Sequence, residues 1–253
     1  MPSPIRVIGV VGIVAIGVLT PTWGPELLSG VAAFRARDLV FEGRIYVPEA
    51  EVVALAGIGP TTSVWTSLEE LESRLREHPL IRTVEIEREL PDRLVIRLGE
   101  RVPVALVPTP TLRPVDREGR YLPIDPAEWQ LDLPLIEPRV EPGREKVAPR
   151  PDRLRSLAGL AAEMMGDAVF WTRVSTIRER EGGGIVAEWV TPEVAFHLDP
   201  GTTLRKLQRG VRALTAELAS PENGLPRAVD LRWADQVYVC SRSGRSRSEC
   251  EDI

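Results

Sequence analysis

The sequence predicts an α+β protein with a single N-terminal transmembrane helix, a small β-α-α-β-β domain, and a second, mixed α+β domain with an antiparallel sheet. Three observations lead to this fold class. An uninterrupted apolar run lies near the N-terminus, at residues 7–19. Behind it, segments with helical spacing of apolar residues alternate with segments in which every second residue is apolar. The 23 prolines argue against a coiled coil or a plain helix bundle, because a proline inside a helix costs about 3 kcal/mol.

The composition is that of a folded protein with room for two small domains. The chain has 253 residues, of which 43% are apolar and 27% charged, and domains cluster near about 100–150 residues. Its 32 basic and 37 acidic residues leave a net charge of −5. This balance argues against a nucleic-acid partner held mainly by phosphate contacts.

The apolar run is interpreted as a retained membrane anchor. Residues 7–19 alone are shorter than the about 20 residues that span a bilayer, and are closer to the core of a cleaved signal peptide. The stretch of low polarity extends over residues 5–23, with Arg6 and Trp23 suited to the two membrane interfaces. No Ala-x-Ala-like cleavage site follows promptly. A retained anchor is therefore preferred, with a cleaved signal peptide as the alternative.

The orientation of this segment is less strongly indicated. Arg6 and the amino terminus favour a cytoplasmic N-terminus, whereas Arg35 and Arg37 follow the run at the edge of the window in which the charge rule applies. No second apolar span follows, so the remainder is exported as a whole or not at all. Residues 1–33 are assigned to a short N-terminus and the anchor.

The first domain is expected at residues 34–101. A strand ends at residues 42–43, and residues 48–57 form a helix with proline at its start and glycine at its end. Ser67 and Glu70 are expected to form a capping box, in which each side chain binds a free amide of the first turn of a second helix.

Two strands complete this domain. The second helix ends near residues 78–79, and apolar residues then alternate with charged ones over 84–87 and again over 94–98. The turn between these strands is expected at residues 91–92. The resulting unit has the order β-α-α-β-β, with helices on one face of its sheet.

The second domain is expected at residues 102–240, with a flexible tail at 241–253. Prolines crowd its first third, which is typical of edge strands, turns and linkers. The expected elements are a hairpin of 112–115 and 120–124 around the turn 116–119, a helix at 152–165, a meander of strands at 172–180, 185–190 and 193–198, a helix at 202–219, and a last strand pair at 228–233 and 236–239.

No constellation for catalysis or cofactor binding is recognised, so the protein is expected not to be an enzyme and to bind no cofactor or metal. The chain has two histidines, His78 and His197, and they fall in different predicted domains. It has no His-Glu-x-x-His, Gly-x-Ser-x-Gly or P-loop motif. An anchored cell-wall hydrolase would need a nucleophile or a metal set, and the sequence offers neither.

The two cysteines, Cys240 and Cys250, lie in the last residues of the sequence. In an oxidising compartment they could close a short loop worth about 2–3 kcal/mol. Two unpaired thiols in a frayed terminus are the alternative, and the sequence does not decide between them.

An ordered set of motifs runs along most of the chain. It comprises the helix at 48–58, the run 79–105 with its Leu-Pro turn and its Glu-Arg-x-Pro-Val-Ala end, the Val-Asp-x-x-Gly hairpin at 115–119, the Leu-Pro segment at 133–136 and Val-Asp-Leu-Arg-Trp at 229–233. In this order the set resembles the bacterial cell-division family FtsQ, called DivIB in Gram-positive organisms. The run 79–105 resembles the family's POTRA domain and the strand that follows, and residues 229–233 resemble a late strand of the family.

The resemblance implies a divisome scaffold without catalytic activity. Its partners would be the membrane-anchored coiled-coil proteins FtsB and FtsL (DivIC-like), together with other divisome proteins, and neither nucleic acid nor a small-molecule substrate. It also implies a single-pass protein of the inner membrane at the division septum, with the bulk of the chain extracytoplasmic. The alternative is a POTRA-containing periplasmic chaperone or assembly factor for envelope proteins, which predicts tandem POTRA repeats or a barrel that the sequence does not show.

The partner-binding site is expected at the last strand. A strand at 236–239 would have few partners left in the sequence and would present an open edge, which is a template for an added strand. The positions that match the family's partner-binding segment are Trp233, Asp235, Val237, Tyr238 and Val239. Packing of these side chains on the domain's own core is the alternative for each of them.

Overall fold

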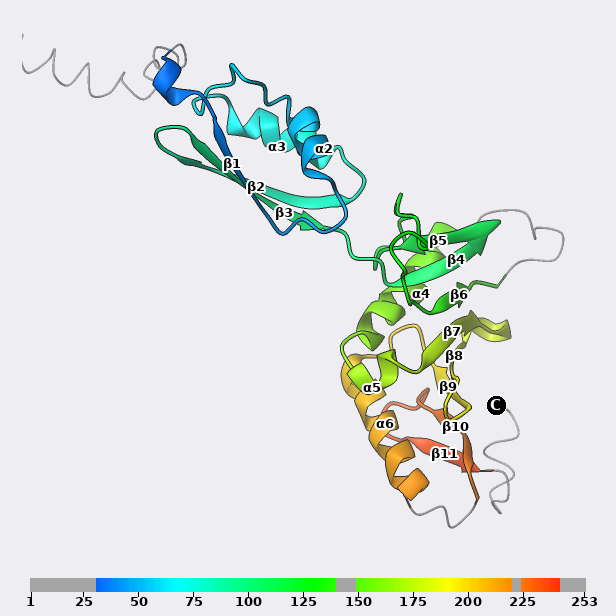
Figure 1. Cartoon of the computed structure of the whole chain (residues 1–253). Helices are drawn as coiled ribbons and strands as arrows, with labels where there is room; N and C mark the ends of the chain where they lie inside the picture. Colours follow the sequence, from blue (N-terminus) through cyan, green and yellow to red (C-terminus); the bar gives the residue numbers. More distant parts are fainter. Residues whose placement is uncertain (1–30, 140–148, 220–223, 242–253) are drawn as a thin grey trace, which may run out of the picture. The chain divides into compact units, whose positions relative to one another are not determined.

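The structure is a computed structural model that describes residues 31–139, 149–219 and 224–241 (Figure 1). The chain divides into two compact units, Met1–Arg101 and Val102–Ile253. None of the helices in these described ranges is both long and apolar enough to cross a membrane. The predicted anchor at residues 5–23 and the predicted tail beyond Ser241 lie outside the described residues.

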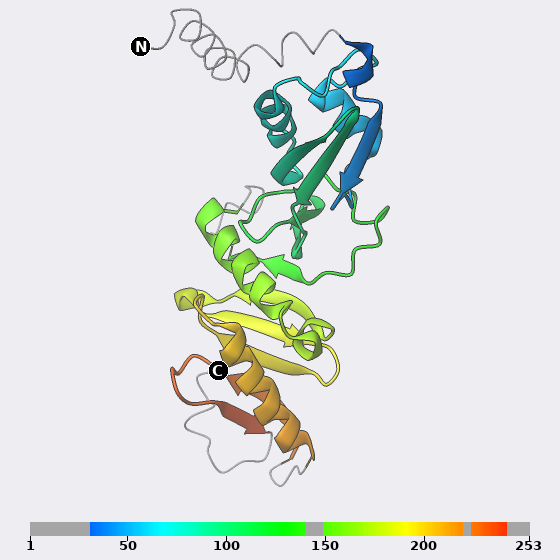
Figure 2. The same ribbon diagram turned by 90° about the vertical axis from the view of Figure 1, so that its left-hand side faces the viewer.

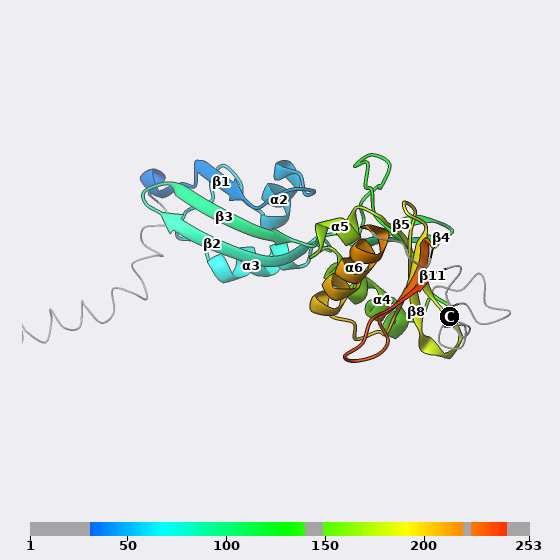
Figure 3. The ribbon, with the colours of Figure 1, turned by 90° about the horizontal axis from the view of Figure 1, so that it is seen from below.

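The described part of the N-terminal unit confirms the predicted β-α-α-β-β order. Its three strands form one sheet in the order β1-β3-β2, in which β1 is parallel to β3 and β2 is antiparallel to β3. Helices α2 and α3 cover one face of this sheet (Figure 3). The elements are a short 3-10 turn at Ala32–Phe34, β1 at Asp38–Glu42, α2 at Glu49–Ala56, α3 at Leu68–Arg76, β2 at Ile81–Glu89 and β3 at Arg93–Glu100.

Local signals set the ends of the two helices. Gly57 ends α2 in the left-handed region, with φ of +70°, which glycine adopts without strain. Ser67 caps α3, because its hydroxyl accepts the Glu70 amide at 3.3 Å. The reciprocal half of the predicted capping box is wrong: the Glu70 carboxylate lies 3.7 Å from Arg74, and Glu69 accepts from the Ser67 hydroxyl instead.

The sheet face away from α2 and α3 carries a ladder of ion pairs. Arg93 binds Asp38 of β1 at 2.6 Å, and Arg97 binds Glu42 of β1 and Glu87 of β2, both at 2.8 Å. These long side chains cover the strand between them, since Val95 is 4% exposed although it points away from the helices. Alternation along β3 therefore places apolar side chains under the helices and charged ones on the open face.

The described part of the C-terminal unit is one sheet covered by helices. The strand order is β11-β10-β9-β8-β7-β6-β4-β5. Helices α4, α5 and α6 lie along one face of it (Figures 1 and 2). The elements are β4 at Ala105–Thr109, β5 at Thr111–Val115, β6 at Leu135–Glu137, α4 at Pro151–Met164, α5 at Ala168–Trp171, β7 at Val174–Glu179, a 3-10 turn at Glu181–Gly183, β8 at Ile185–Trp189, β9 at Val194–Leu198, α6 at Leu204–Ala219, β10 at Pro226–Asp230 and β11 at Tyr238–Ser241.

This sheet is mixed, and the prediction of an antiparallel sheet is wrong for part of it. Strands β7, β8 and β9 form the predicted antiparallel meander. Three other pairings are parallel: β4 with β6, β6 with β7, and β9 with β10. The last of these follows from the crossover helix α6, because a helix between two neighbouring strands returns the chain in the original direction.

The predicted hairpin around residues 116–119 is present only in its turn. The Asp116 carboxylate accepts the amides of Glu118 and Arg120 at 3.0 and 2.9 Å, and Gly119 has φ of +74°. The expected return strand at 120–124 makes one isolated bridge, between Tyr121 and Val115. The partner of β5 is instead β4, joined to it through Pro110. A single proline between two strands gave too weak a turn signal to be predicted.

The core lies between the sheet and the helices. Its centre is an aromatic cluster of Phe170 from α5, Trp189 from β8 and Phe196 from β9, with ring centroids 4.8–5.3 Å apart. Phe170 and Phe196 are fully buried. The cluster therefore joins the helical layer to the strands that support β10 and β11.

Candidate partner-binding edge

The candidate site begins with β11, the strand at one end of the large sheet (Figure 1). It pairs antiparallel with β10, so that Val239 is opposite Val229 and Cys240 is opposite Ala228. Among the described residues, no strand pairs with its other side. The predicted edge strand is therefore present, although it spans Tyr238–Ser241 and not 236–239.

Strand β10 and the residues after it hold β11 against the core. Val229 and Leu231 are fully buried beside α6, which contacts both β10 and β11. Gly210 of α6 permits this approach, since a Cβ there would lie 2.9 Å from a methyl carbon of Leu231. The chain on both sides of Asp230 is therefore held against α6.

A network of hydrogen bonds shapes the segment between β10 and β11. Arg232 binds the Asp230 carboxylate through Nε and Nη2, at 3.0 and 2.7 Å, and through its backbone amide at 2.9 Å. The Leu231 amide donates to the His197 carbonyl at 2.9 Å, and Arg209 of α6 donates to the Ala234 carbonyl at 3.0 Å. These bonds fix the loop at 231–237 to two neighbouring elements.

The predicted site residues fall in two settings. Trp233 and Asp235 are exposed in the loop, and the Trp233 side chain is 59% accessible. Val237, Tyr238 and Val239 are half-buried, and Val237 and Val239 pack against the core. The predicted strand 228–233 ends at Asp230, so Trp233 belongs to the loop and not to a strand. The predicted set therefore combines an exposed loop with a strand whose outer edge is open within the described chain.

The cysteine prediction concerns the same strand. Cys240 lies on β11, is buried and is disulfide-bonded. Cys250, the other cysteine of the sequence, lies outside the described residues. Its pairing with Cys240 stays a prediction.

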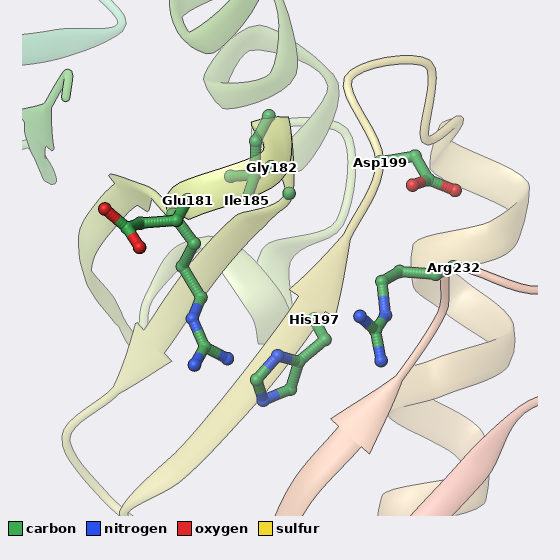
Figure 4. A pocket seen from close by; sticks show the side chains of 8 residues that line it. Glu181, Gly182, Ile185, His197, Asp199 and Arg232 are labelled. Atoms are coloured by element: carbon green, nitrogen blue, oxygen red, sulfur yellow. The ribbon is translucent and has the colours of Figure 1, made fainter. Parts of the chain in front are cut away.

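A pocket that the sequence did not predict adjoins this loop on the sheet face away from the helices (Figure 4). It has a volume of about 510 Å³. Its lining residues come from the β7–β8 turn, β8, β9 and the segments that follow β9 and β10: Arg180, Glu181, Gly182, Gly184, Ile185, His197, Asp199 and Arg232. Alternation along β9 was the available signal, because Phe196 in the core requires His197 on the opposite face.

Burial and neighbouring charges set the protonation states of His197 and Asp230. His197 is 5% exposed, and burial lowers its pKa from 6.5 to about 4, while Asp230 opposes this shift and Arg180 and Arg232 add to it. Burial alone would raise the pKa of Asp230, but the hydrogen bonds from Arg232 outweigh burial and lower it. At neutral pH a neutral imidazole therefore lines the pocket, and the carboxylate of the neighbouring Asp230 is ionised.

Neither the edge nor the pocket contains an arrangement for metal binding. Within the described ranges, no group of three His, Cys, Asp or Glu side chains is placed to hold a metal ion. The chemistry that this region offers is hydrogen bonding through the backbone of β11 and contact through the exposed loop.

Comparison with known proteins identifies the family. Residues 34–101 match the family model described as "POTRA domain, FtsQ-type". The chain is 31% identical over 133 residues to the cell division protein FtsQ of Myxococcus fulvus, a match covering 51% of this chain and 46% of that protein. It is 30% identical over 185 residues to FtsQ of Anaeromyxobacter sp. (72% and 55% covered) and 26% identical over 221 residues to FtsQ of Geotalea daltonii (85% and 78% covered).

The matched part of the chain spans about half the length of the Myxococcus and Anaeromyxobacter relatives. The longest of the three matches, to the Geotalea protein, extends well beyond the POTRA domain. These matches agree with the motif order in the sequence and with the β-α-α-β-β topology of the N-terminal unit. The chain belongs to the FtsQ family of cell division proteins, with residues 34–101 as its POTRA domain.

Proposed function

We propose that this protein is a non-enzymatic scaffold of the division machinery that captures a membrane-anchored coiled-coil partner of the FtsB or FtsL type through the edge of β11. The observation that carries the proposal is the position of β11 at the end of the sheet, with no strand of the described chain on its outer side. An extended partner segment could add there as a further strand, with backbone hydrogen bonds supplying affinity.

The loop at 231–237 would supply specificity. Trp233 combines high exposure with a residue type that is common at binding hot spots. The hydrogen bonds of Arg232 and Arg209 hold this loop in place before any partner arrives. The loop therefore loses little conformational entropy on binding, and this favours affinity.

Family membership supports a place at the division-site membrane, with residues 5–23 as a single anchor and the two units outside the cytoplasm. An oxidising compartment of this kind would also suit a bond between Cys240 and Cys250. A fluorescent fusion of the full chain should collect at mid-cell, and a fusion that stays evenly distributed would contradict the assignment.

Binding to the extracytoplasmic part of the FtsB-like protein of the same organism tests the edge directly. Trp233→Ala should weaken capture by about tenfold or more, as expected for a hot-spot aromatic. Val237 is a poorer target for substitution, because it packs on the core and a lysine there would mix folding with binding.

Trp129→Ala is the matched control. Trp129 is also exposed, at 42%, but it precedes β6, which is separated from β11 by four strands of the sheet. Its removal should leave affinity unchanged. Equal affinity of the Trp233→Ala variant and the parent protein, measured by isothermal calorimetry, would contradict the proposed role of the loop at 231–237 in capture.

A further inference from the structure

The POTRA domain has an edge strand that its own helix closes. Strand β2 lies at one end of the small sheet and, within the part of the chain that the structure describes, has β3 as its one neighbouring strand. The Ile86 amide donates to the Glu72 carboxylate at 3.2 Å, and the Val84 carbonyl accepts from Arg76 at 3.4 Å. Glu72 and Arg76 belong to α3, so these bonds come from the side chains of a neighbouring helix.

These two side chains reproduce the hydrogen-bonding pattern of a neighbouring strand. Residues 84 and 86 direct their amide and carbonyl groups to the same side of β2, away from β3, because alternate residues of a strand share a direction. A residue of an added parallel strand would donate to the Val84 carbonyl and accept from the Ile86 amide. Arg76 supplies that donor and Glu72 supplies that acceptor.

Further contacts hold the side chains of Glu72 and Arg76 beside β2. Glu72 and Arg76 form an ion pair at 2.5 Å, one helical turn apart. The buried side chains of Leu71 and Leu75 fix the rotation of α3 on the sheet. Arg88 of β2 donates to the carbonyls of Val64 and Thr66, at 2.6 and 2.7 Å, and so fastens the segment before α3 to the same strand.

We infer that Glu72 and Arg76 form an edge clamp that closes β2 of the POTRA domain against strand addition, including pairing with β2 of a second copy. Proteins commonly protect exposed strand edges, because unpaired amides and carbonyls are templates for association. The clamp occupies the central pair of outward groups on a strand of nine residues. Removal of the clamp exposes the Val84 carbonyl and the Ile86 amide without altering the apolar face of the sheet.

The test is the double variant Glu72→Ala with Arg76→Ala in the full chain, purified in detergent. Alanine preserves α3, because it has the highest helix propensity. Hydrogen exchange at the Ile86 amide should become about tenfold faster or more, as expected for loss of a charge-assisted hydrogen bond. The variant should also self-associate with increasing concentration in analytical ultracentrifugation, whereas the parent protein should not.

Two further variants separate the clamp from general effects of charge. Glu70→Ala breaks an ion pair of the same residue types and spacing on the same helix, keeps the hydrogen bond from Arg74 to the Ala56 carbonyl, and should leave Ile86 exchange and association unchanged. Glu72→Gln keeps an acceptor oxygen without the charge, and should retain most of the protection of Ile86.

Unchanged exchange at Ile86 in the double variant would overturn the clamp itself. Faster exchange without any concentration-dependent association would overturn its role against strand addition. An effect of Glu72→Gln on Ile86 exchange as large as that of the double variant would overturn the role of the Glu72 acceptor oxygen in the clamp.

Discussion

Acidification should destabilise the C-terminal unit through His197. Its pKa in the folded protein is about 4, against an ordinary value of 6.5. Above the ordinary value both the folded and the unfolded chain carry a neutral imidazole, so His197 has no effect there. Below it the unfolded chain takes up the proton first, and the free energy of unfolding falls until the pH passes the folded pKa.

The size of this effect follows from the two pKa values. The loss reaches about 2 kcal/mol near about pH 5 and approaches about 3 kcal/mol at most below about pH 4. The charged groups around the imidazole are Asp230 on β10, which opposes the shift, and Arg180 and Arg232, which reinforce it. Glu181 and Asp199 line the same pocket.

Urea unfolding at about pH 7 and about pH 5, for the parent chain and for His197→Gln, measures this contribution. The variant should lose about 2 kcal/mol less than the parent between the two conditions, because glutamine does not titrate. His78→Gln is the control at the other histidine and should keep the His197-dependent loss. The reasoning fails if parent and His197→Gln lose the same free energy, or if an NMR titration gives His197 an ordinary pKa.

Two further substitutions test the fold that supports the site. Phe170→Ala should lower the free energy of unfolding by about 3–5 kcal/mol, because it empties the centre of the aromatic cluster. Val169→Ala, at an exposed position of the same helix, should lower it by less than about 0.5 kcal/mol. Similar losses for both would contradict the assigned core. Gly119→Ala should lower the free energy of unfolding by about 2 kcal/mol or more, because φ is +74° and the new Cβ would lie 2.7 Å from the Arg155 amide nitrogen. Thermal unfolding measures this loss, and an unchanged melting temperature would refute the close approach of Gly119 to Arg155.

Local signals made the N-terminal unit predictable. Gly57 ends α2 and Ser67 begins α3 through contacts within a few residues, and alternation along β2 and β3 shows in the sequence directly. The predicted capping box at the start of α3, however, was only half correct. There the Ser67 hydroxyl accepts the Glu70 amide as predicted, but it donates to the Glu69 carboxylate, and the Glu70 carboxylate pairs with Arg74 one turn later.

The pairing of strands in the C-terminal unit was less predictable, because it depends on residues far apart in the chain. Strand β6 has three residues and lies between β4 and β7, which surround it in space but not in sequence. The direction of β10 follows from α6 and its packing, and no residue of β10 itself encodes it. Antiparallel order was therefore predicted correctly for the meander and for the last strand pair, β10 with β11, and wrongly for the pairings that join the rest of the sheet.

The edge could be located from the sequence, and the pocket beside it could not. Trp233 and Tyr238 stood out as aromatic residues in a late segment that matches the family. Arg180, His197 and Arg232 come from separate turns and strands, and only the pairing of β7 with β8, β8 with β9 and β9 with β10 makes them line one pocket. Arg232 lies in the Val-Asp-Leu-Arg-Trp motif at 229–233, but neither Arg180 nor His197 lies in a motif that single-sequence reasoning would select.

The place of β11 in the large sheet also has a consequence for biosynthesis. The strand is the last one along the described chain, and its neighbour β10 depends on β9 and on α6 for its own position. During synthesis from the N-terminus, domains fold as their residues become available. The edge that we propose as the partner site is therefore completed last, so that a chain cut short before residue 238 would have a POTRA domain but no means of capture.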